Sequence, residues 1–440
     1  YIATDTKIIY QDTGTAWQKV GAVKWGDLED KPASFTPTTH GNEAHDPDFA
    51  LASDLAAHLA ETVLKTNKTI NVPADYPTIQ AALDSLKYTW IPSDVTVTIQ
   101  VAAGTYTHTS PIIINHPCGN QIKIIGATPV TTTCSGVGTI TGSAGNWSVP
   151  ITVASSSGIA AGDYVIIKDT TGTGDHYAVR GVWKVISVDS ANQITVQNTH
   201  RASAFPTATL SGGNVVALKT ILKFTGCKGL VVGPNSALGL LNNVVLVGDG
   251  SANSGVLVGR LNSDLSVPGP AFIILGSNFG VNGFGSDGIW AGYGGIVSAY
   301  PGVPVSGNAG SGFAAELGGS IWASNAVANG NGQHGFWATN NGAIWASYST
   351  ASGNSACGFW AGHGGSIITS SSTATNNQDM GIAVVNGGTI YAATSTVFGN
   401  VNSDYFAWIC SSINAAGYKG TSTFSPAANT VGNANAIIVT

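Results

Sequence analysis

The chain has 440 residues, and only 9% of them are charged, against about 25% in an average globular protein. Its 57 glycines and single methionine argue against a long-helix protein, and the scarcity of charge argues against a disordered polyelectrolyte. The net charge of −6 comes without a basic cluster, which disfavours nucleic acid and an anionic membrane surface as main partners. No apolar run approaches the roughly 18 residues of a membrane-spanning helix, so we expect a soluble, β-rich protein without membrane insertion.

The first two segments are residues 1–25 and residues 26–69. The second is rich in prolines and is expected to be an extended linker. Within it, Ser53 to Leu64 carries leucines on one side and is expected to form a short helix that would be marginal alone.

A solenoid is expected to begin at residues 70–129. Here Thr78 to Leu86 follows a proline and predicts a short amphipathic helix, with Thr78 as N-cap, that covers the open end of the solenoid. Residues 130–220 contain apolar strands without the repeat found further on, and they carry more charge. We therefore expect an inserted antiparallel β-domain in that segment.

Residues 221–425 contain a repeat of 23 residues, and residues 426–440 are expected to cap it. The repeat is clearest for an asparagine that recurs at Asn308, Asn331, Asn354, Asn377 and Asn400. A second column with the same step consists of Ile321, Ile344, Ile367 and Ile390. Short alternating strands between Gly, Asn and Ser turns predict one turn of a β-solenoid per repeat, with equivalent residues stacked about 4.8 Å apart. Stacked asparagines can then bond through their side-chain amides.

Several segments resemble parts of bacteriophage tail fibres and tailspikes. The first six residues with Gly14 to Trp17 are similar to a short module of such fibres, and Trp25 to Pro37 to the connector that follows it. Tyr76 to Leu83 resembles the opening of pectate-lyase-like right-handed β-helices, and Gly162 to Ile166 the β-domain inserted into some phage spikes. The resemblance implies an all-β, right-handed parallel β-helix with about 23 residues per rung. It also implies a homotrimeric virion appendage whose residues 1–25 bind the phage tail or baseplate.

Alternation along the strands predicts two external columns of aromatic side chains. The first column contains Trp290, Trp337, Trp360 and Phe406. The second column contains Trp322, Trp345 and Tyr391. Each column has two interpretations, a platform for substrate binding on which sugar rings stack, or an interface between three parallel solenoids.

Between Arg260 and Lys419 there is neither Lys nor Arg. A polyanion lyase needs cations at the substrate carboxylate and is disfavoured on this part, whereas glycoside hydrolysis needs only two carboxylates. Glu316 is expected to face outward, beside Ala314, which replaces Trp in the first column and leaves a gap. Asp287, at the turn of the preceding rung, is the candidate second catalytic carboxylate. The alternative is a solvated surface charge and a turn residue.

No cofactor and no metal are expected, since the five cysteines are widely spaced and contain no CxxC pair. The set His40, His45 and His58, near two aspartates, is a weak pattern for a metal on a trimer axis. His334 and His363 lie beside turns and are expected to be surface or interface residues rather than bases.

These observations favour a phage tailspike or tail fibre protein of the virion that recognises host cell-surface polysaccharide, with glycoside hydrolase activity as one hypothesis. The alternative is a non-catalytic structural or adhesive fibre, in which the aromatic columns hold the trimer together.

Overall fold

The structure is a computed structural model. It describes residues 2–3, 8–12, 17–22, 62–199, 205–206, 208–251, 253–260, 269–419, 422–425 and 436–440. The chain divides into two units, residues 1–60 and 61–440, and each is described by itself. In the first unit the strands β1 (Ile2–Ala3), β2 (Ile8–Asp12) and β3 (Trp17–Ala22) pair antiparallel in that order. The histidine set His40, His45 and His58 lies outside the described residues, as does the expected helix from Ser53 up to residue 61; at its expected end, Val63 instead forms a parallel bridge with Trp90.

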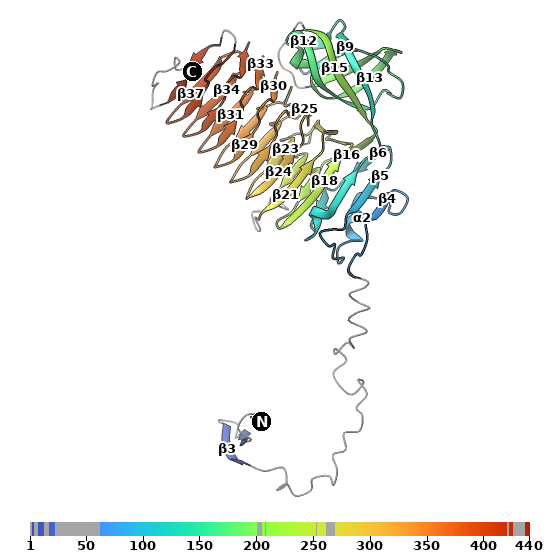
Figure 1. The fold of residues 1–440 in the computed structure, drawn as a ribbon, viewed down its shortest axis with the longest axis vertical. Helices are drawn as coiled ribbons and strands as arrows, with labels where there is room; N and C mark the ends of the chain where they lie inside the picture. Colours follow the sequence, from blue (N-terminus) through green and yellow to red (C-terminus); the bar gives the residue numbers. More distant parts are fainter. Residues whose placement is uncertain are drawn as a thin grey trace. The chain divides into compact units, whose positions relative to one another are not determined.

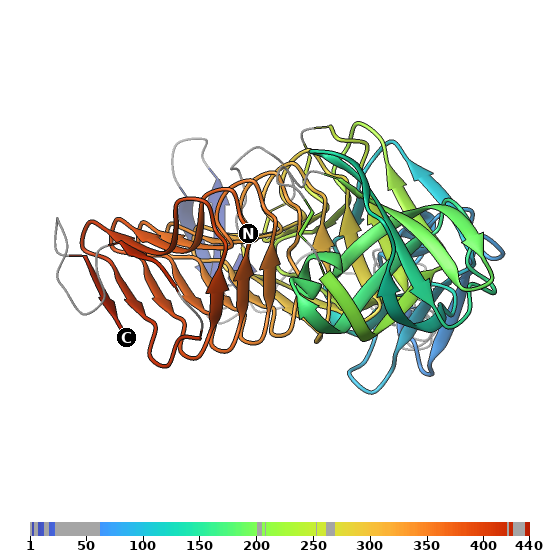
Figure 2. The ribbon, with the colours of Figure 1, turned by 90° about the horizontal axis from the view of Figure 1, so that it is seen from above.

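The second unit is built mainly from parallel strands that wind into a solenoid (Figure 1). One face of the solenoid, sheet 1, consists of β4 (Lys68–Val72), β5 (Val97–Val101), β8 (Ile122–Ile125), β18 (Ser236–Asn242), β21 (Ala271–Leu275), β24 (Gly295–Ala299), β27 (Ser320–Trp322), β29 (Ala343–Trp345), β32 (Ser366–Ile368), β35 (Thr389–Tyr391), β38 (Ser412–Asn414) and β40 (Ile437–Val439). Figure 2 shows the C-terminal rungs succeeding one another along a single axis.

Two further faces complete each turn. Sheet 2 consists of β7 (Ile112–Ile114), β17 (Leu230–Val232), β20 (Val256–Val258), β23 (Ile289–Ala291), β26 (Phe313–Ala315), β28 (Phe336–Ala338), β31 (Phe359–Gly362), β34 (Met380–Val385), β37 (Ser403–Trp408) and β39 (Phe424–Ser425). Sheet 3 consists of β6 (Gly104–His108), β16 (Thr220–Phe224), β19 (Val244–Val247), β22 (Phe279–Asn282), β25 (Val305–Ser306), β30 (Thr350–Ser352), β33 (Thr373–Thr375) and β36 (Thr396–Phe398). Single bridges through Val327 connect β25 to β30.

The core follows from the repeat, because equivalent apolar side chains stack along the axis. Phe313 and Phe336 have ring centroids 5.0 Å apart at an interplanar angle of 2°, and Phe336 and Phe359 are 4.8 Å apart at 5°. The isoleucines of sheet 1 pair in the same way, from Ile321 onward, and are fully buried. The expected fold class, an all-β parallel β-helix with rungs of about 23 residues, is confirmed.

The asparagine column is a continuous buried ladder at one turn of the solenoid. Asn354 Nδ2 donates to Asn377 Oδ1 (3.0 Å), and Asn354 Oδ1 accepts from Asn331 Nδ2 (3.1 Å) and from the backbone N–H of Asn331 (2.9 Å). The same pattern joins Asn308 to Asn331 and Asn377 to Asn400. Each side chain therefore satisfies buried polar groups of the rung before it and fixes the register between rungs.

The inserted domain is an antiparallel barrel. Its strands are β9 (Val130–Val137), β10 (Thr141–Ser143), β11 (Asn146–Val153), β12 (Tyr164–Gly174), β13 (Gly181–Ser190), β14 (Gln193–Thr199) and β15 (Ala208–Leu218). The pairing order runs from β11 through β14, β13, β12 and β15 to β9, and β9 pairs back onto β11. This closure removes the free edges, and Trp183 lies buried in the barrel core.

Helix α2 (Ile79–Asp84) covers the first rungs, as expected from the sequence. Its N-cap is Thr78, whose Oγ1 accepts from the N–H of Ala81 at 3.0 Å, and its residues Ile79, Ala82 and Leu83 are buried against the solenoid core. Short 3-10 turns η3 (Gly119–Gln121) and η4 (His176–Val179) lie in the solenoid and the barrel. Among the described residues, no helix has the length and apolar character that crossing a membrane requires.

Candidate functional site

The register of sheet 2 places the first aromatic set in one file. Trp290 pairs with Ala314, Ala314 with Trp337, and Trp337 with Trp360. The file continues through Ala383 to Phe406. The rings of Trp337 and Trp360 are 6.2 Å apart and inclined at 51°, so they form an uneven aromatic surface rather than a flat stack.

The second set forms a file along sheet 1. Trp322 pairs with Trp345, and the file passes through Ile368 to Tyr391. These aromatic side chains are open, since Trp322 is 45%, Trp345 37% and Tyr391 47% exposed. The rings of Trp322 and Trp345 lie 5.9 Å apart. With Ile368 between Trp345 and Tyr391 they form an exposed apolar strip, which in a monomer is a mark of a binding or assembly surface.

A pocket of about 160 Å³ lies beside Trp290. Ala314, between Trp290 and Trp337 in the file, is fully buried among them and does not line the pocket, so the expected gap at Ala314 is not the pocket. Both carboxylates singled out in the sequence line this pocket, Glu316 just after β26 and Asp287 in the turn before β23. The complete lining is Ser254, Leu257, Arg260, Ser286, Asp287, Trp290, Glu316 and Leu317.

Glu316 is held in place by its neighbours. Its Oε2 accepts a hydrogen bond from Trp290 Nε1 at 2.8 Å, and its backbone N–H donates to the carbonyl of Ala291 at 2.9 Å. The next residue, Leu317, has φ of 50°, a left-handed turn conformation that a leucine seldom adopts. The carboxylate at this turn is therefore oriented before any ligand arrives.

Asp287 is buried, unlike Glu316. Its Oδ1 accepts from the backbone N–H of Ser311 at 2.8 Å. The pKa of Asp287 is raised to about 6, chiefly by burial; the bond from Ser311 opposes this shift, and the nearby charge of Glu316 adds to it. The pocket therefore contains one carboxyl group that stays protonated in mildly acidic solution.

Trp290 differs from the exposed platform residue expected from the alternation. It points outward but is only 6% exposed, because Leu257 and Tyr293 pack around it and the guanidinium of Arg260 lies 5.1 Å from its ring centroid. Its indole therefore supports Glu316 and presents little open face to a sugar ring.

Sequence reasoning missed Arg260 as part of the site. The sequence showed it only as the last cation before a long stretch without Lys or Arg, whereas the structure places it on the pocket wall. Lys228 is close enough for the charge of Arg260 to lower the pKa of the Lys228 ammonium, after burial, which is the larger cause. The alternation of side chains within one strand does not indicate that Arg260 and Lys228 lie near each other, because the two residues come from different rungs.

His334 packs against two tryptophans of the first file. Its ring stacks at 5.5 Å and 28° on Trp360 and at 6.4 Å and 25° on Trp337. Its Nδ1 accepts from the backbone N–H of Cys357 at 3.2 Å, and burial lowers the pKa of His334 to about 4. A neutral imidazole packed on two indoles extends the aromatic surface. In the described residues, no group of three His, Cys, Asp or Glu side chains has the arrangement of a metal site.

Among the comparisons with known proteins, only the comparison with solved structures found matches, and these are distant. No family model matches the chain, and no curated protein matches it. The A-module of mannuronan C-5 epimerase AlgE4 from Azotobacter vinelandii is 11% identical, with 82% of this chain and 87% of that chain covered and a TM-score of 0.39.

Two tailspikes of Pseudomonas phages are also similar. Tailspike protein gp49 of phage LKA1 is 14% identical over 80% of this chain and 66% of that chain, with a TM-score of 0.29. Tailspike gp61 of phage phi297 is 11% identical over 73% and 71%, with a TM-score of 0.23. Because all three TM-scores are below 0.5, the fold of this chain rests on its own strand register, and no function is transferred from these likenesses.

Proposed function

We propose that this chain is a receptor-binding tailspike or tail fibre protein of a phage virion, which binds a host surface polysaccharide and hydrolyses it in the pocket of Glu316 and Asp287. The sequence resemblance to phage appendages supports the first part. The proposal includes a homotrimer that attaches to the phage tail through its N-terminal residues and acts at the host cell surface.

The observation that carries the enzymatic part is the meeting of two carboxyl groups in one pocket with different environments. Asp287 is buried with a pKa raised to about 6, and Glu316 is oriented by the indole N–H of Trp290. Pairs of carboxyl groups whose environments separate their protonation are the usual means of acid and base catalysis on glycosides.

The roles follow from this difference. Protonated Asp287 donates its proton to the glycosidic oxygen as the bond to the anomeric carbon breaks. Ionised Glu316 either attacks the anomeric carbon or takes a proton from an attacking water molecule. The aromatic file beyond the gap, Trp337 and Trp360 with His334, provides apolar ring faces against which neighbouring sugar units pack.

The test is release of reducing ends from a panel of purified bacterial capsular and O-antigen polysaccharides. We expect Glu316→Gln and Asp287→Asn to lower the rate at least about 100-fold, since each group acts in proton transfer. The matched control is Asp379→Asn, which changes a carboxylate that accepts from Asn402 on a later rung, outside the pocket. Equal rates for wild type, both pocket variants and the control would contradict the proposed site.

The second candidate is an adhesive fibre without catalysis, and the exposure of Trp322, Trp345 and Tyr391 favours it for sheet 1. These side chains suit a contact between solenoids as well as they suit sugar. Mass measurement in solution separates the two uses. If Trp345→Ala turns a trimer into monomers, the strip is an interface, whereas lost glycan binding at unchanged mass makes it a platform.

A further inference from the structure

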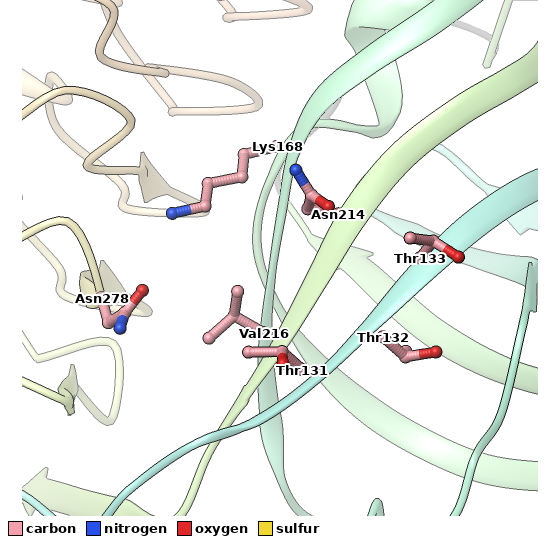
Figure 3. A pocket seen from close by; sticks show the side chains of 7 residues that line it. All are labelled: Thr131, Thr132, Thr133, Lys168, Asn214, Val216 and Asn278. Atoms are coloured by element: carbon pink, nitrogen blue, oxygen red, sulfur yellow. The ribbon is translucent and has the colours of Figure 1, made fainter.

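A groove runs between the inserted barrel and the solenoid, away from the carboxylate pocket. Two pockets, of about 390 Å³ and about 310 Å³, lie along it, and Lys168 of β12 lines both. Figure 3 shows the larger one, in which Lys168 extends from the barrel strand while Asn278 of the solenoid lies on the opposite side.

The two walls are fixed relative to each other by buried polar contacts. Asp175 Oδ2 accepts from Ser352 Oγ (3.2 Å) and from Thr375 Oγ1 (3.1 Å) on sheet 3. Asn329 Nδ2 donates to the carbonyls of Tyr177 (2.8 Å) and Arg180 (3.0 Å). A groove with such walls is formed before a ligand arrives, which lowers the entropic cost of binding.

Two cations of the barrel face this groove. Lys168 Nζ donates to the carbonyl of Ser277 at 3.3 Å, and burial lowers the pKa of Lys168. The guanidinium of Arg180 lies 4.7 Å from the ring centroid of Tyr177 and donates to Thr350 Oγ1 at 3.3 Å.

Neither cation forms a direct ion pair in the described residues, although Asp169 acts on both at longer range and Asp175 acts on Arg180. Within the described part of the chain, the one ion pair is that of Lys219 with Asp163, so Lys168 and Arg180 have no carboxylate oxygen within 4 Å there. Asp169 lies on the same wall, and its Oδ2 accepts from Asn214 Nδ2 at 3.0 Å. A half-buried cation whose charged head has no carboxylate in direct contact provides a favourable place for an anionic group.

The remaining lining is mostly hydroxyl and amide groups, with Tyr348 as an open aromatic ring and with Val216, Val327, Gly302 and Tyr177 as the other members. Figure 3 shows the amides of Asn214 and Asn278 on either side of Lys168, with Val216 and three threonines completing the lining of the larger pocket. On the solenoid side the lining includes Thr350, Ser371, Thr373 and Tyr348, and Tyr348 is 63% exposed. Alternating donors and acceptors beside an aromatic face match the hydroxyl groups and the apolar ring face of a saccharide.

We propose that this groove is a second saccharide site, which takes an acidic sugar with its carboxylate at Lys168 and its ring against Tyr348. The cations that the solenoid lacks between Arg260 and Lys419 are thus supplied by the insertion. The site binds without cleaving, because its one carboxylate, Asp169, has no second carboxyl group beside it in the described lining.

The experiment is calorimetric titration of the full chain with three acidic tetrasaccharides, namely tetragalacturonate, tetraguluronate and a hyaluronan tetrasaccharide. The methyl ester of tetragalacturonate is the neutral counterpart, and inorganic phosphate tests for a simple anion site. We expect at least one acidic tetrasaccharide to bind, and Lys168→Met to weaken it about tenfold or more. Matched controls are Lys184→Met, an exposed lysine of the same barrel, and Tyr300→Ala, an exposed tyrosine outside the groove, against Tyr348→Ala.

Each result decides the proposal. Binding that Lys168→Met and Tyr348→Ala weaken, but Lys184→Met, Tyr300→Ala and Glu316→Gln do not, supports it independently of the hydrolase proposal. It is overturned if no acidic tetrasaccharide binds, if the Lys168 variant binds as tightly as wild type with an unchanged unfolding temperature, or if phosphate binds as tightly as the sugars. Crystals of the Tyr348→Ala variant soaked with the best ligand provide a second readout, since an unaltered pose would exclude a role for the ring.

Discussion

The asparagine ladder provides the sharpest test of the register on which the functional site depends. Replacing Asn354 by Ala removes a side chain from the middle of the ladder. Its Oδ1 accepts from the backbone N–H and the Nδ2 of Asn331, and its Nδ2 donates to the carbonyl of Ala328 and to Asn377 Oδ1. All four hydrogen bonds are buried, so no water replaces the missing partners.

The size of the effect follows from these contacts. A buried hydrogen bond contributes about 1 kcal/mol net, so four lost bonds lower the free energy of unfolding by about 4 kcal/mol. The unpaired backbone N–H of Asn331 increases this loss of stability, and local relaxation of the turn reduces it. Because each rung contacts only its neighbours, the loss weakens the interfaces on both sides of the altered rung.

The assay is urea unfolding followed by tryptophan fluorescence, with Asn402→Ala as the matched control. Asn402 is exposed and makes one side-chain bond, from Nδ2 to Asp379 Oδ1 at 2.7 Å. We expect the control to change the free energy of unfolding by less than about 1 kcal/mol. Equal midpoints for the two variants would refute the claim that the buried ladder holds the rungs in register.

Three further predictions concern the site. Asp287→Asn is expected to raise the free energy of unfolding by about 3 kcal/mol at pH 8 and to leave it unchanged at pH 3. The reason is that the pKa of Asp287 rises from 3.8 to about 6 on folding, so that ionising this group above that range destabilises the fold. Urea unfolding at both pH values checks this. Between pH 6.5 and about 4, protonation of His334 lowers the free energy of unfolding while protonation of Asp287 raises it, so the His334 contribution is measured as a difference: His334→Gln is expected to gain stability relative to wild type as the pH falls over this range in thermal unfolding. Trp337→Ala is expected to raise the KM for polysaccharide more than it lowers kcat, since its ring contacts sugar outside the reacting pair, and a kcat loss alone would contradict that role.

The solenoid and its columns could be predicted because stacking converts a fixed sequence interval into spatial neighbours. The interval of 23 between Asn331 and Asn354 is also the interval between Phe336 and Phe359, and both pairs meet across adjacent rungs. Strand alternation then decides which side chains leave the core. The same rule places Glu316 on the outside of the rung that follows the turn of Asp287, and the two carboxyl groups line one pocket.

The residues that pack over the pocket could not be predicted in this way, because they belong to loops whose lengths depart from the 23-residue repeat. Trp290 is outward by alternation, yet Arg260 and Tyr293 close over it from turns whose course the repeat does not determine. The groove at Lys168 depends on how the barrel docks, through Asp175 and its partners on sheet 3, over separations of 177 to 201 positions. A local sequence pattern does not predict contacts between residues so far apart in the chain.

The pocket lies where the repeat is changing, and this position has a physical reason. In the regular rungs the first file carries Trp337, Trp360, Ala383 and Phe406, and apart from Ala383 these positions present large aromatic side chains. Asp287 and Ser311 are 24 positions apart, whereas the corresponding pair further along, His334 and Cys357, is 23 apart. A site for chemistry on a solenoid requires such a departure, because concavity and buried charge both need a rung that differs from its neighbours. The regular rungs beyond it then extend the binding surface by repetition, which suits a polymer made of repeating units.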